Sequence, residues 1–214
     1  MNEVLVEGNG IQLPGLYKLP EKTSGLVIFA HGSGSSRLSP RNQFVADYLN
    51  KRGIATLLFD LLTEDESQDR RNVFDIGLLA ERLTMASEWV RKQPVFKGLP
   101  IGYFGASTGA AAALVAAADP GQQISAVVSR GGRPDLAIPR LKKVTAPTLL
   151  LVGGLDHQVI VLNKQAATHL HHCEIIIVPG ATHLFEEPGT LEQVCDHAAD
   201  WFAKYLVAGK VSDH

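Results

Sequence analysis

Hydrophobic and polar positions along this chain alternate in a way that predicts strands and helices in turn. Residues 2–7 and 11–19 alternate apolar and polar side chains around a Gly-Asn-Gly turn, which is typical of an antiparallel hairpin. Continuous apolar runs come later, and each predicts a strand that is covered on both faces. These runs are 26–30, 54–59, 101–104, 124–128, 148–152 and 174–178.

Helical periodicity occupies the intervals between the apolar runs. Residues 73–90 carry apolar side chains at a spacing of about 3.6, which predicts a long amphipathic helix. We expect further helices over 40–52, 107–118, 161–169 and 190–206. The most polar stretch, 63–72, predicts a solvated loop. The interval from 128 to 148 leaves room for a short helix but not for an inserted lid domain.

This alternation predicts the α/β class. We expect a mostly parallel central sheet with helices on both faces, an opening antiparallel hairpin and no lid domain. The 214 residues contain no internal repeat, low-complexity segment or linker, so they predict one domain over 1–214. Residues 207–214 are expected to fray.

Composition narrows the partners. The net charge of −2 argues against a nucleic-acid partner and against a basic membrane-binding surface. No apolar run is as long as a membrane span, and the first residues do not resemble a signal peptide. Cys173 and Cys195 form no C-x-x-C pair and are interpreted as reduced core thiols. These features predict a cytoplasmic protein.

The candidate nucleophile lies in the segment Gly105-Ala106-Ser107-Thr108-Gly109, between an apolar run and an alanine-rich helix. A serine on a sharp strand-to-helix turn is the nucleophile elbow, which exposes the hydroxyl above the sheet. Glycines two residues before and after Ser107 have a steric reason, since a β-carbon at either place would clash in so tight a turn. We therefore predict that Ser107 is the nucleophile.

A base and an acid follow later in the chain. In an open α/β sheet, ligands bind at the carboxyl ends of the strands, and Asp156 and His183 each follow a separate apolar run there. The order serine, acid, histidine is that of α/β-hydrolases. Singly, Ser107 could be a small turn residue, Asp156 a loop cap and His183 a packed loop histidine. All three together, in this order, predict a catalytic triad.

Other histidines are assigned structural roles. His31 is expected to shape the loop that follows residues 26–30. His169, His171 and His172 lie near a helix C-terminus, where exposed carbonyls favour a histidine cation, and lack acidic or cysteine partners at metal-site spacing beyond Cys173. We therefore predict no metal and no other cofactor.

Charge that develops on a carbonyl oxygen during attack needs fixed donors, commonly two backbone N–H groups. Thr108, directly after the nucleophile, is expected to supply one. Ser33, in the His-Gly-Ser-Gly loop, is expected to supply the other, since the glycines there allow the backbone to approach a substrate closely.

With these residues assigned, the chain closely resembles the dienelactone hydrolase-like branch of the α/β-hydrolase superfamily. The matching segments are HGSGSS at 31–36, GASTG at 105–109, GGLD at 153–156 and ATHLFEEPG at 181–189. The resemblance implies a lidless, cofactor-free serine hydrolase with Ser107, Asp156 and His183 as its triad. Dienelactone hydrolase itself has cysteine as nucleophile, so we expect a carboxylic ester here rather than dienelactone.

Basic residues near these loops suggest two opposite roles. Arg130 and Arg133, with Arg37 and Arg41 in the first loop, could bind an anionic group of the substrate, since arginine binds carboxylates and phosphates bidentately. They could instead pair internally with Asp135 or Asp60. Both interpretations stay open at this point, and Arg130, Arg133, Arg37 and His31 are the candidate substrate-binding residues.

The sequence thus predicts an esterase that acts on a small-molecule ester, as a monomer or a homodimer. A thioesterase, deacetylase or amidase would use the same triad. A non-catalytic binding protein of the same fold is the alternative from another class, and a broken triad would be its mark. The glycines around Ser107 do not have the G-x-G-x-x-G spacing of dinucleotide-binding loops, and no G-x-x-x-x-G-K-[ST] is present.

Overall fold

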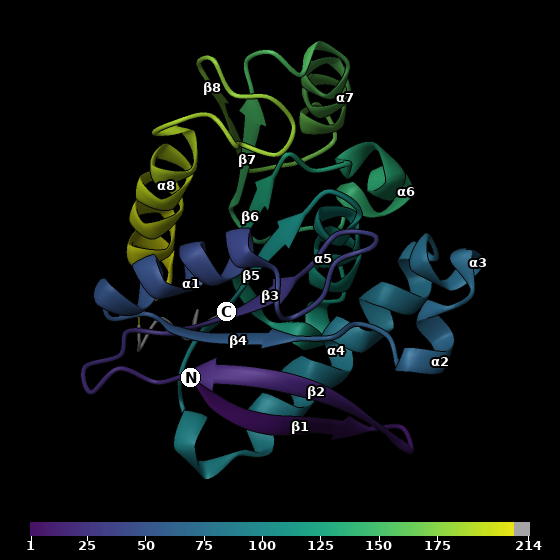
Figure 1. Cartoon of the computed structure of the whole chain (residues 1–214), viewed down its shortest axis with the longest axis vertical. Helices are drawn as coiled ribbons and strands as arrows, with labels where there is room; N and C mark the ends of the chain where they lie inside the picture. The colour runs from purple at the N-terminus through teal and green to yellow at the C-terminus, as the bar shows by residue number, and fades with distance from the viewer. Residues whose placement is uncertain (208–214) are drawn as a thin grey trace.

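The structure, a computed structural model, describes residues 1–207 and is built on an eight-stranded sheet in the order β1-β2-β4-β3-β5-β6-β7-β8 (Figure 1). The strands are β1 (Asn2–Gly8), β2 (Ile11–Lys18), β3 (Leu26–Ala30), β4 (Ala55–Phe59), β5 (Ile101–Ala106), β6 (Ile124–Arg130), β7 (Thr148–Gly153) and β8 (Cys173–Val178). The pairs β1–β2 and β2–β4 are antiparallel and the others parallel. This confirms the predicted sheet. Of the predicted frayed tail, residues 208–214 lie outside the described part.

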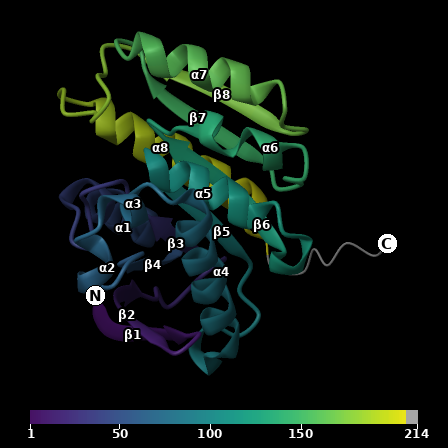
Figure 2. The ribbon, with the colours of Figure 1, turned by 90° about the vertical axis from the view of Figure 1, so that its right-hand side faces the viewer.

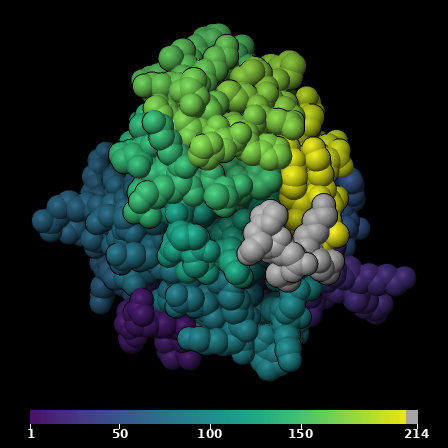
Figure 3. All heavy atoms as spheres, turned by 180° about the vertical axis from the view of Figure 1, so that it is seen from behind, coloured from purple at the N-terminus to yellow at the C-terminus, as the bar shows by residue number. Residues whose placement is uncertain are grey.

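Helices cover both faces of the sheet (Figure 2). The longer ones are α1 (Pro40–Lys51), α4 (Ile76–Lys92), α5 (Thr108–Ala117), α7 (His157–Ala167) and α8 (Thr190–Tyr205), and the one-turn helices are α2 (Glu64–Ser67), α3 (Arg70–Val73) and α6 (Ile138–Leu141). Helices α1 and α8 pack on one face, and α4 and α5 on the other. From behind, the hairpin lies at one end of the molecule and α7 with β8 at the other (Figure 3).

Strand β3 shows why these segments form a buried parallel sheet. All its residues are buried, and they alternate between the two cores: Val27 and Phe29 face α1 and α8, whereas Ile28 faces α4 and α5. A continuous apolar run therefore serves two helical layers at once. The small side chains of α5 let that helix pack closely against β5 and bring the elbow to the centre of the sheet.

The prediction that 63–72 is a loop was wrong, because this stretch contains α2 and most of α3. Thr63 and Glu66 form a capping box, in which each side chain accepts a hydrogen bond from the other's backbone N–H. Asp69 caps the next turn, and Asp75 caps α4, which therefore begins at residue 76 rather than 73. Polar side chains here start helices instead of solvating a loop.

Helix α7, in contrast, begins earlier than predicted, at His157 instead of residue 161. Asp156 occupies the position just before its first turn, and the backbone carbonyl of Asp156 accepts the first helical hydrogen bond, from Ile160. The side chain of Asp156 makes no capping bond and is left to interact elsewhere. The interval between β6 and β7 holds the expected short helix, α6.

Candidate active site

Ser107 lies at the turn between β5 and α5 in a backbone conformation that an L-residue rarely adopts. Its φ is 51° and its ψ is −120°. Such strain persists only where the surrounding structure enforces it, and it is concentrated at functional sites. The Ser107 N–H donates to the carbonyl of Arg130, and its own carbonyl accepts from the N–H of Arg133. Backbone bonds to the neighbouring strand end thus hold the elbow in place.

The glycines around Ser107 mark the two places where backbones approach most closely. A β-carbon on Gly105 would lie 2.4 Å from the Ala110 Cα, and one on Gly109 would lie 2.2 Å from the carbonyl oxygen of Ala30. Both contacts are with rigid backbone, so no larger residue fits at either position. The predicted steric reason for these two glycines is confirmed.

Asp156 and His183, which lie at the carboxyl ends of β7 and β8, meet through one hydrogen bond. The Nδ1–H of His183 donates to Oδ2 of Asp156 over 2.7 Å. In a neutral imidazole this bond places the proton on Nδ1, which leaves Nε2 as the nitrogen that can accept a proton. No hydrogen bond joins Ser107 to His183 within residues 1–207, and in sites without substrate this contact is commonly long.

Gly131 shows how His183 lies relative to the elbow. It follows Arg130, whose carbonyl binds the Ser107 N–H, and a β-carbon on Gly131 would lie 3.6 Å from Cε1 of the His183 ring. The φ of Gly131 is 51°, which also favours glycine. The histidine ring therefore lies beside the end of β6, where the carbonyl of Arg130 binds the elbow.

A clamp that the sequence analysis missed holds the loop of His183. The carboxylate of Glu187 accepts hydrogen bonds from both the backbone N–H (3.0 Å) and the hydroxyl (2.6 Å) of Thr182, the residue before His183. These bonds lower the pKa of the Glu187 carboxyl. The spacing of five residues within one loop was the only signal of this pair in the sequence.

The two residues predicted to supply oxyanion donors, Thr108 and Ser33, are in contact. The backbone N–H of Ser33 donates to the hydroxyl of Thr108 over 3.1 Å, and Thr108 is only 4% exposed. The adjacent Gly32 lies against the side chain of Ser107, since a β-carbon there would lie 3.2 Å from Cβ of Ser107. The loop after β3 therefore lies directly against the elbow, as an oxyanion loop requires.

His31 binds two backbone groups and joins the loops after β3 and β4. Its Nδ1–H donates to the carbonyl of Gly32 (2.9 Å), and its Nε2 accepts from the N–H of Leu61 (3.1 Å). Burial lowers the pKa of His31 and keeps the ring neutral. Both ring nitrogens are occupied, which fits the loop-shaping role expected of His31.

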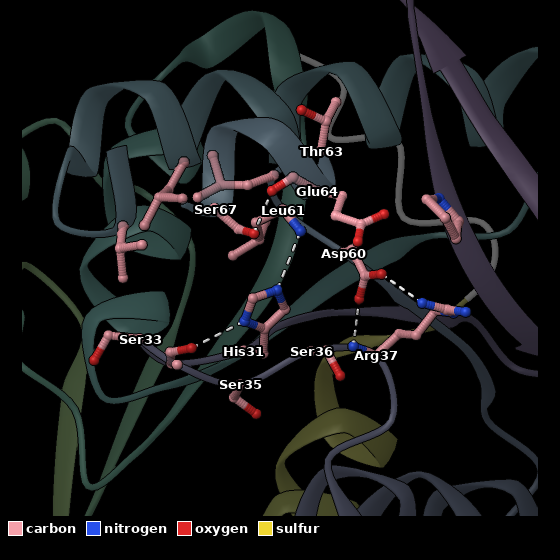
Figure 4. A pocket seen from close by; sticks show the side chains of 16 residues that line it. His31, Ser33, Ser35, Ser36, Arg37, Asp60, Leu61, Thr63, Glu64 and Ser67 are labelled. Atoms are coloured by element: carbon pink, nitrogen blue, oxygen red, sulfur yellow. Dashed lines mark hydrogen bonds and ion pairs between the residues drawn. The ribbon is translucent and has the colours of Figure 1, made fainter. Parts of the chain in front are cut away.

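A cavity of about 580 Å³ lies beside the loop of Ser33 (Figure 4). It is lined by Pro14, by residues 31–37 and 60–64, and by Ser67, Val73 and Leu79. Ser33 lines it, whereas Ser107, Asp156 and His183 do not. The loops after β3 and β4 line the cavity, whereas His183 follows β8, on the other side of β5 in the sheet order.

Three of the four arginines near the site have acidic partners. Arg37 binds Asp60 through its backbone N–H and its guanidinium, and Arg133 forms a bidentate pair with Asp135 (2.9 and 2.8 Å). Arg41 contacts the exposed Glu186 at 3.3 Å. Of the two roles considered for Arg37 and Arg133, the structure therefore has internal pairing.

Arg130 differs from these three. It is 7% exposed, and within residues 1–207 it forms no salt bridge. Its Nη2 lies 3.4 Å from Oδ1 of Asn42, and its guanidinium lies 6.0 Å from the centre of the Phe185 ring. Burial and the nearby Arg41 lower the pKa of Arg130 to about 10. Arg130 is thus a buried cation beneath the loop of His183.

The histidines near the C-terminus of α7 bind protein groups. His171 contacts the carbonyl of Lys142, and His172 contacts the hydroxyl of Tyr205. Within the described residues, no group of three or more His, Cys, Asp or Glu side chains is placed to hold a metal ion. Over the same residues, no helix is both long and apolar enough to cross a membrane.

The profile of the dienelactone hydrolase family matches residues 15–206. The chain belongs to the dienelactone hydrolase family. A crystal structure of dienelactone hydrolase from Anabaena variabilis is 51% identical, covers 96% of this chain and 97% of its own, and superposes with a TM-score of 0.93. Est1E from Butyrivibrio proteoclasticus, at 17% identity and a TM-score of 0.82 over 95% of this chain and 98% of its own, shares the fold. The predicted family and fold are thereby confirmed.

Longer relatives contain the same family domain. Proteins from two strains of Mycobacterium tuberculosis, each named putative phosphoribosyl transferase, are 58% identical over 205 residues, which is 95% of this chain and 46% of theirs. The chain therefore spans about half the length of these relatives. Membership of the dienelactone hydrolase family makes hydrolysis the activity to test in the chain itself.

Proposed function

We propose that this chain is a serine hydrolase that cleaves small carboxylic esters through an acyl-enzyme. The observation that carries the proposal is the strained Ser107 at the elbow, beside a histidine whose Nδ1–H is held by Asp156 at 2.7 Å. Family membership supports hydrolysis in general. The serine mechanism rests on this arrangement of side chains.

The reaction would proceed in two halves. Nε2 of His183 takes the proton from Ser107 as the hydroxyl oxygen attacks the ester carbonyl carbon, and the carbonyl oxygen becomes an oxyanion beside Thr108 and Ser33. The bond to the alcohol oxygen then breaks, and His183 returns the proton to the leaving alcohol. Water then attacks the acyl carbon while His183 takes its proton, the bond from the acyl carbon to Oγ of Ser107 breaks, and His183 returns the proton to Oγ as the acid leaves. Asp156 stabilises the imidazolium in both halves.

The same machinery could cleave a thioester, an acetyl group on nitrogen or an amide, because only the leaving group changes. An ester is the primary proposal, since an alkoxide leaves more readily than an amide nitrogen. A non-catalytic binding role is disfavoured by the bond between His183 and Asp156 and by the strain at Ser107. A binding protein would have no use for either feature.

A preference for substrates with an anionic group now depends on Arg130. Arg37 and Arg133 are neutralised by Asp60 and Asp135, which leaves little charge for a ligand. Arg130 is the buried cation without a carboxylate in the described part of the chain, and its backbone adjoins Ser107. An anionic group on the alcohol side of the ester could supply the missing counter-charge.

Hydrolysis of p-nitrophenyl acetate by the wild-type protein and by Ser107→Ala tests the proposal. We expect turnover with an initial burst of p-nitrophenol in the wild type and a loss of at least about 10³-fold in Ser107→Ala. Ser129→Ala, which removes a buried serine hydroxyl outside the proposed machinery, is the matched control. Equal rates in wild type and Ser107→Ala would contradict the proposal.

A further inference from the structure

The cavity and the catalytic base lie on opposite sides of the nucleophile. In the sheet order, Ser107 follows β5, His183 follows β8, and the cavity is lined by the loops after β3 and β4 (Figures 1 and 4). Strands β3 and β4 lie on one side of β5, and β6, β7 and β8 lie on the other. A substrate bound at Ser107 therefore has His183 on one side and the cavity on the other.

This placement assigns the two halves of the ester, and the step rests on the proposed function. His183 has to give its proton to the alcohol oxygen, so the alcohol lies on the His183 side. The acyl group points away from the leaving alcohol and passes Ser33, which borders both the elbow and the cavity. The cavity is thus the space that the acyl group can reach.

The cavity is much larger than an acetyl group requires. Pockets for small molecules have volumes of about 300–1,000 Å³, and this one, at about 580 Å³, lies within that range. An acetyl group would leave most of the volume to water. A longer acyl chain would displace that water and bury apolar surface.

The lining shows which acyl groups suit the cavity. Aliphatic side chains form part of its wall: Pro14, Leu61, Leu62, Val73 and Leu79. Arg37 is neutralised by Asp60, and Glu64 adds a carboxylate that no salt bridge compensates within residues 1–207. The charge that remains is negative, so an acyl group with an anionic end would be repelled.

We infer that this cavity is the acyl pocket and that it takes an uncharged, predominantly aliphatic acyl group longer than acetyl. The juxtaposition of Ser33 with Thr108 places the mouth of the pocket at the oxyanion loop. The hydroxyls of Ser33, Ser35 and Ser36 lie at the polar edge, and the aliphatic wall is formed by β2, the loop after β4, α3 and α4. The inference does not extend to the alcohol half of the ester.

Chain length is tested with p-nitrophenyl acetate, butyrate, hexanoate and octanoate at concentrations below micelle formation. The leaving group is constant, so differences in kcat/KM report on the acyl side. Burial of a methylene group corresponds to about fourfold in kcat/KM, and we expect a rise of at least about tenfold from acetate to hexanoate. Val73→Phe narrows the cavity and is expected to abolish this rise, whereas Val95→Phe, at an exposed position outside the cavity, is expected to retain it.

The charge of the pocket is tested with two esters of equal length, p-nitrophenyl octanoate and mono-p-nitrophenyl suberate. We expect kcat/KM at least about tenfold lower for the anionic suberate ester, because like charges disfavour its binding. Glu64→Gln is expected to narrow this difference. Asp65→Asn removes the same charge from a neighbouring residue that does not line the cavity, and is expected to leave the difference unchanged.

The two proposals fail differently. No Ser107-dependent turnover of any of these esters would overturn the proposed function. Ser107-dependent turnover with acetate as good as hexanoate, or with Val73→Phe unchanged in its chain-length profile, would overturn the acyl pocket alone. Preference for the suberate ester over octanoate would overturn the uncharged character of the pocket.

Discussion

The backbone N–H of Ser33 donates to the side-chain hydroxyl of Thr108, so the two residues expected to supply backbone oxyanion donors are bonded to each other. An oxyanion that took the Ser33 N–H would have to displace this hydroxyl. The Thr108 hydroxyl accepts this bond, and no acceptor for its own proton is present among residues 1–207. Its O–H is therefore free to donate to the oxyanion while the Ser33 N–H holds it in place.

Replacing Thr108 by Val removes the hydroxyl and preserves the shape of the side chain. We expect kcat on p-nitrophenyl acetate to fall about 10²-fold, because one oxyanion donor is lost, with a small change in KM. Thr108→Ser retains the hydroxyl and is expected to stay within about threefold of wild type in kcat. An unchanged or faster Thr108→Val enzyme would mean that Ser33 alone supplies the second donor.

Removing Glu187 is expected to loosen the loop that carries His183. Glu187→Ala loses both bonds to Thr182, and displacement of the base is expected to lower kcat about tenfold or more. Glu186→Ala, at the adjacent position, loses only a contact with Arg41 and is the control. Steady-state kinetics of the two variants separate the roles, and equal effects would argue against the clamp.

His31 is expected to make the protein less stable in mild acid. Its pKa in the folded state is lowered by burial, so below about pH 6.5 the unfolded state binds more protons than the folded state. The free energy of unfolding is therefore not reduced by His31 above the unfolded-state pKa. It begins to fall as the pH falls through 6.5. The urea midpoint should fall more steeply from pH 7.5 to 5.5 in wild type than in His31→Asn. Parallel slopes would contradict this role.

Replacing Arg130 is expected to affect both the stability of the protein and its preference among substrates. Arg130→Met replaces the buried guanidinium by an apolar side chain of comparable length, and we expect the free energy of unfolding to rise by about 1–3 kcal/mol. If Arg130 binds an anionic group of the substrate, the variant should lose kcat/KM on esters whose alcohol carries an anionic group. It should keep kcat/KM on esters whose alcohol is uncharged. Equal losses on both kinds of ester would contradict the anion-binding role.

Much of the fold and the candidate triad could be predicted because local rules determine them. Apolar runs marked the buried strands, and the glycines flanking Ser107 marked the elbow, whose strain is a property of one short segment. Asp156 and His183 could be assigned because parallel strands end at one edge of the sheet. Neither assignment needed knowledge of distant contacts.

The remaining features depend on contacts through space. Ser33 and Thr108 lie 75 residues apart, and nothing local shows that one binds the other. Arg37 could equally have faced a substrate or Asp60, and only the packing of the two loops decides between them. The helix at Glu64–Ser67 was different, since the Thr63 to Glu66 capping box is present in the sequence and was outweighed by the polarity of the stretch.

The central claim is that Ser107 is a nucleophile activated by His183, and covalent labelling tests it most directly. The protein is treated with a fluorophosphonate, digested, and the modified peptide is identified by mass spectrometry. The account predicts one phosphonyl adduct, on Ser107, with labelling at least about 10³-fold slower in His183→Ala. Labelling at another serine, or a wild-type Ser107 that remains unmodified under these conditions, would contradict it.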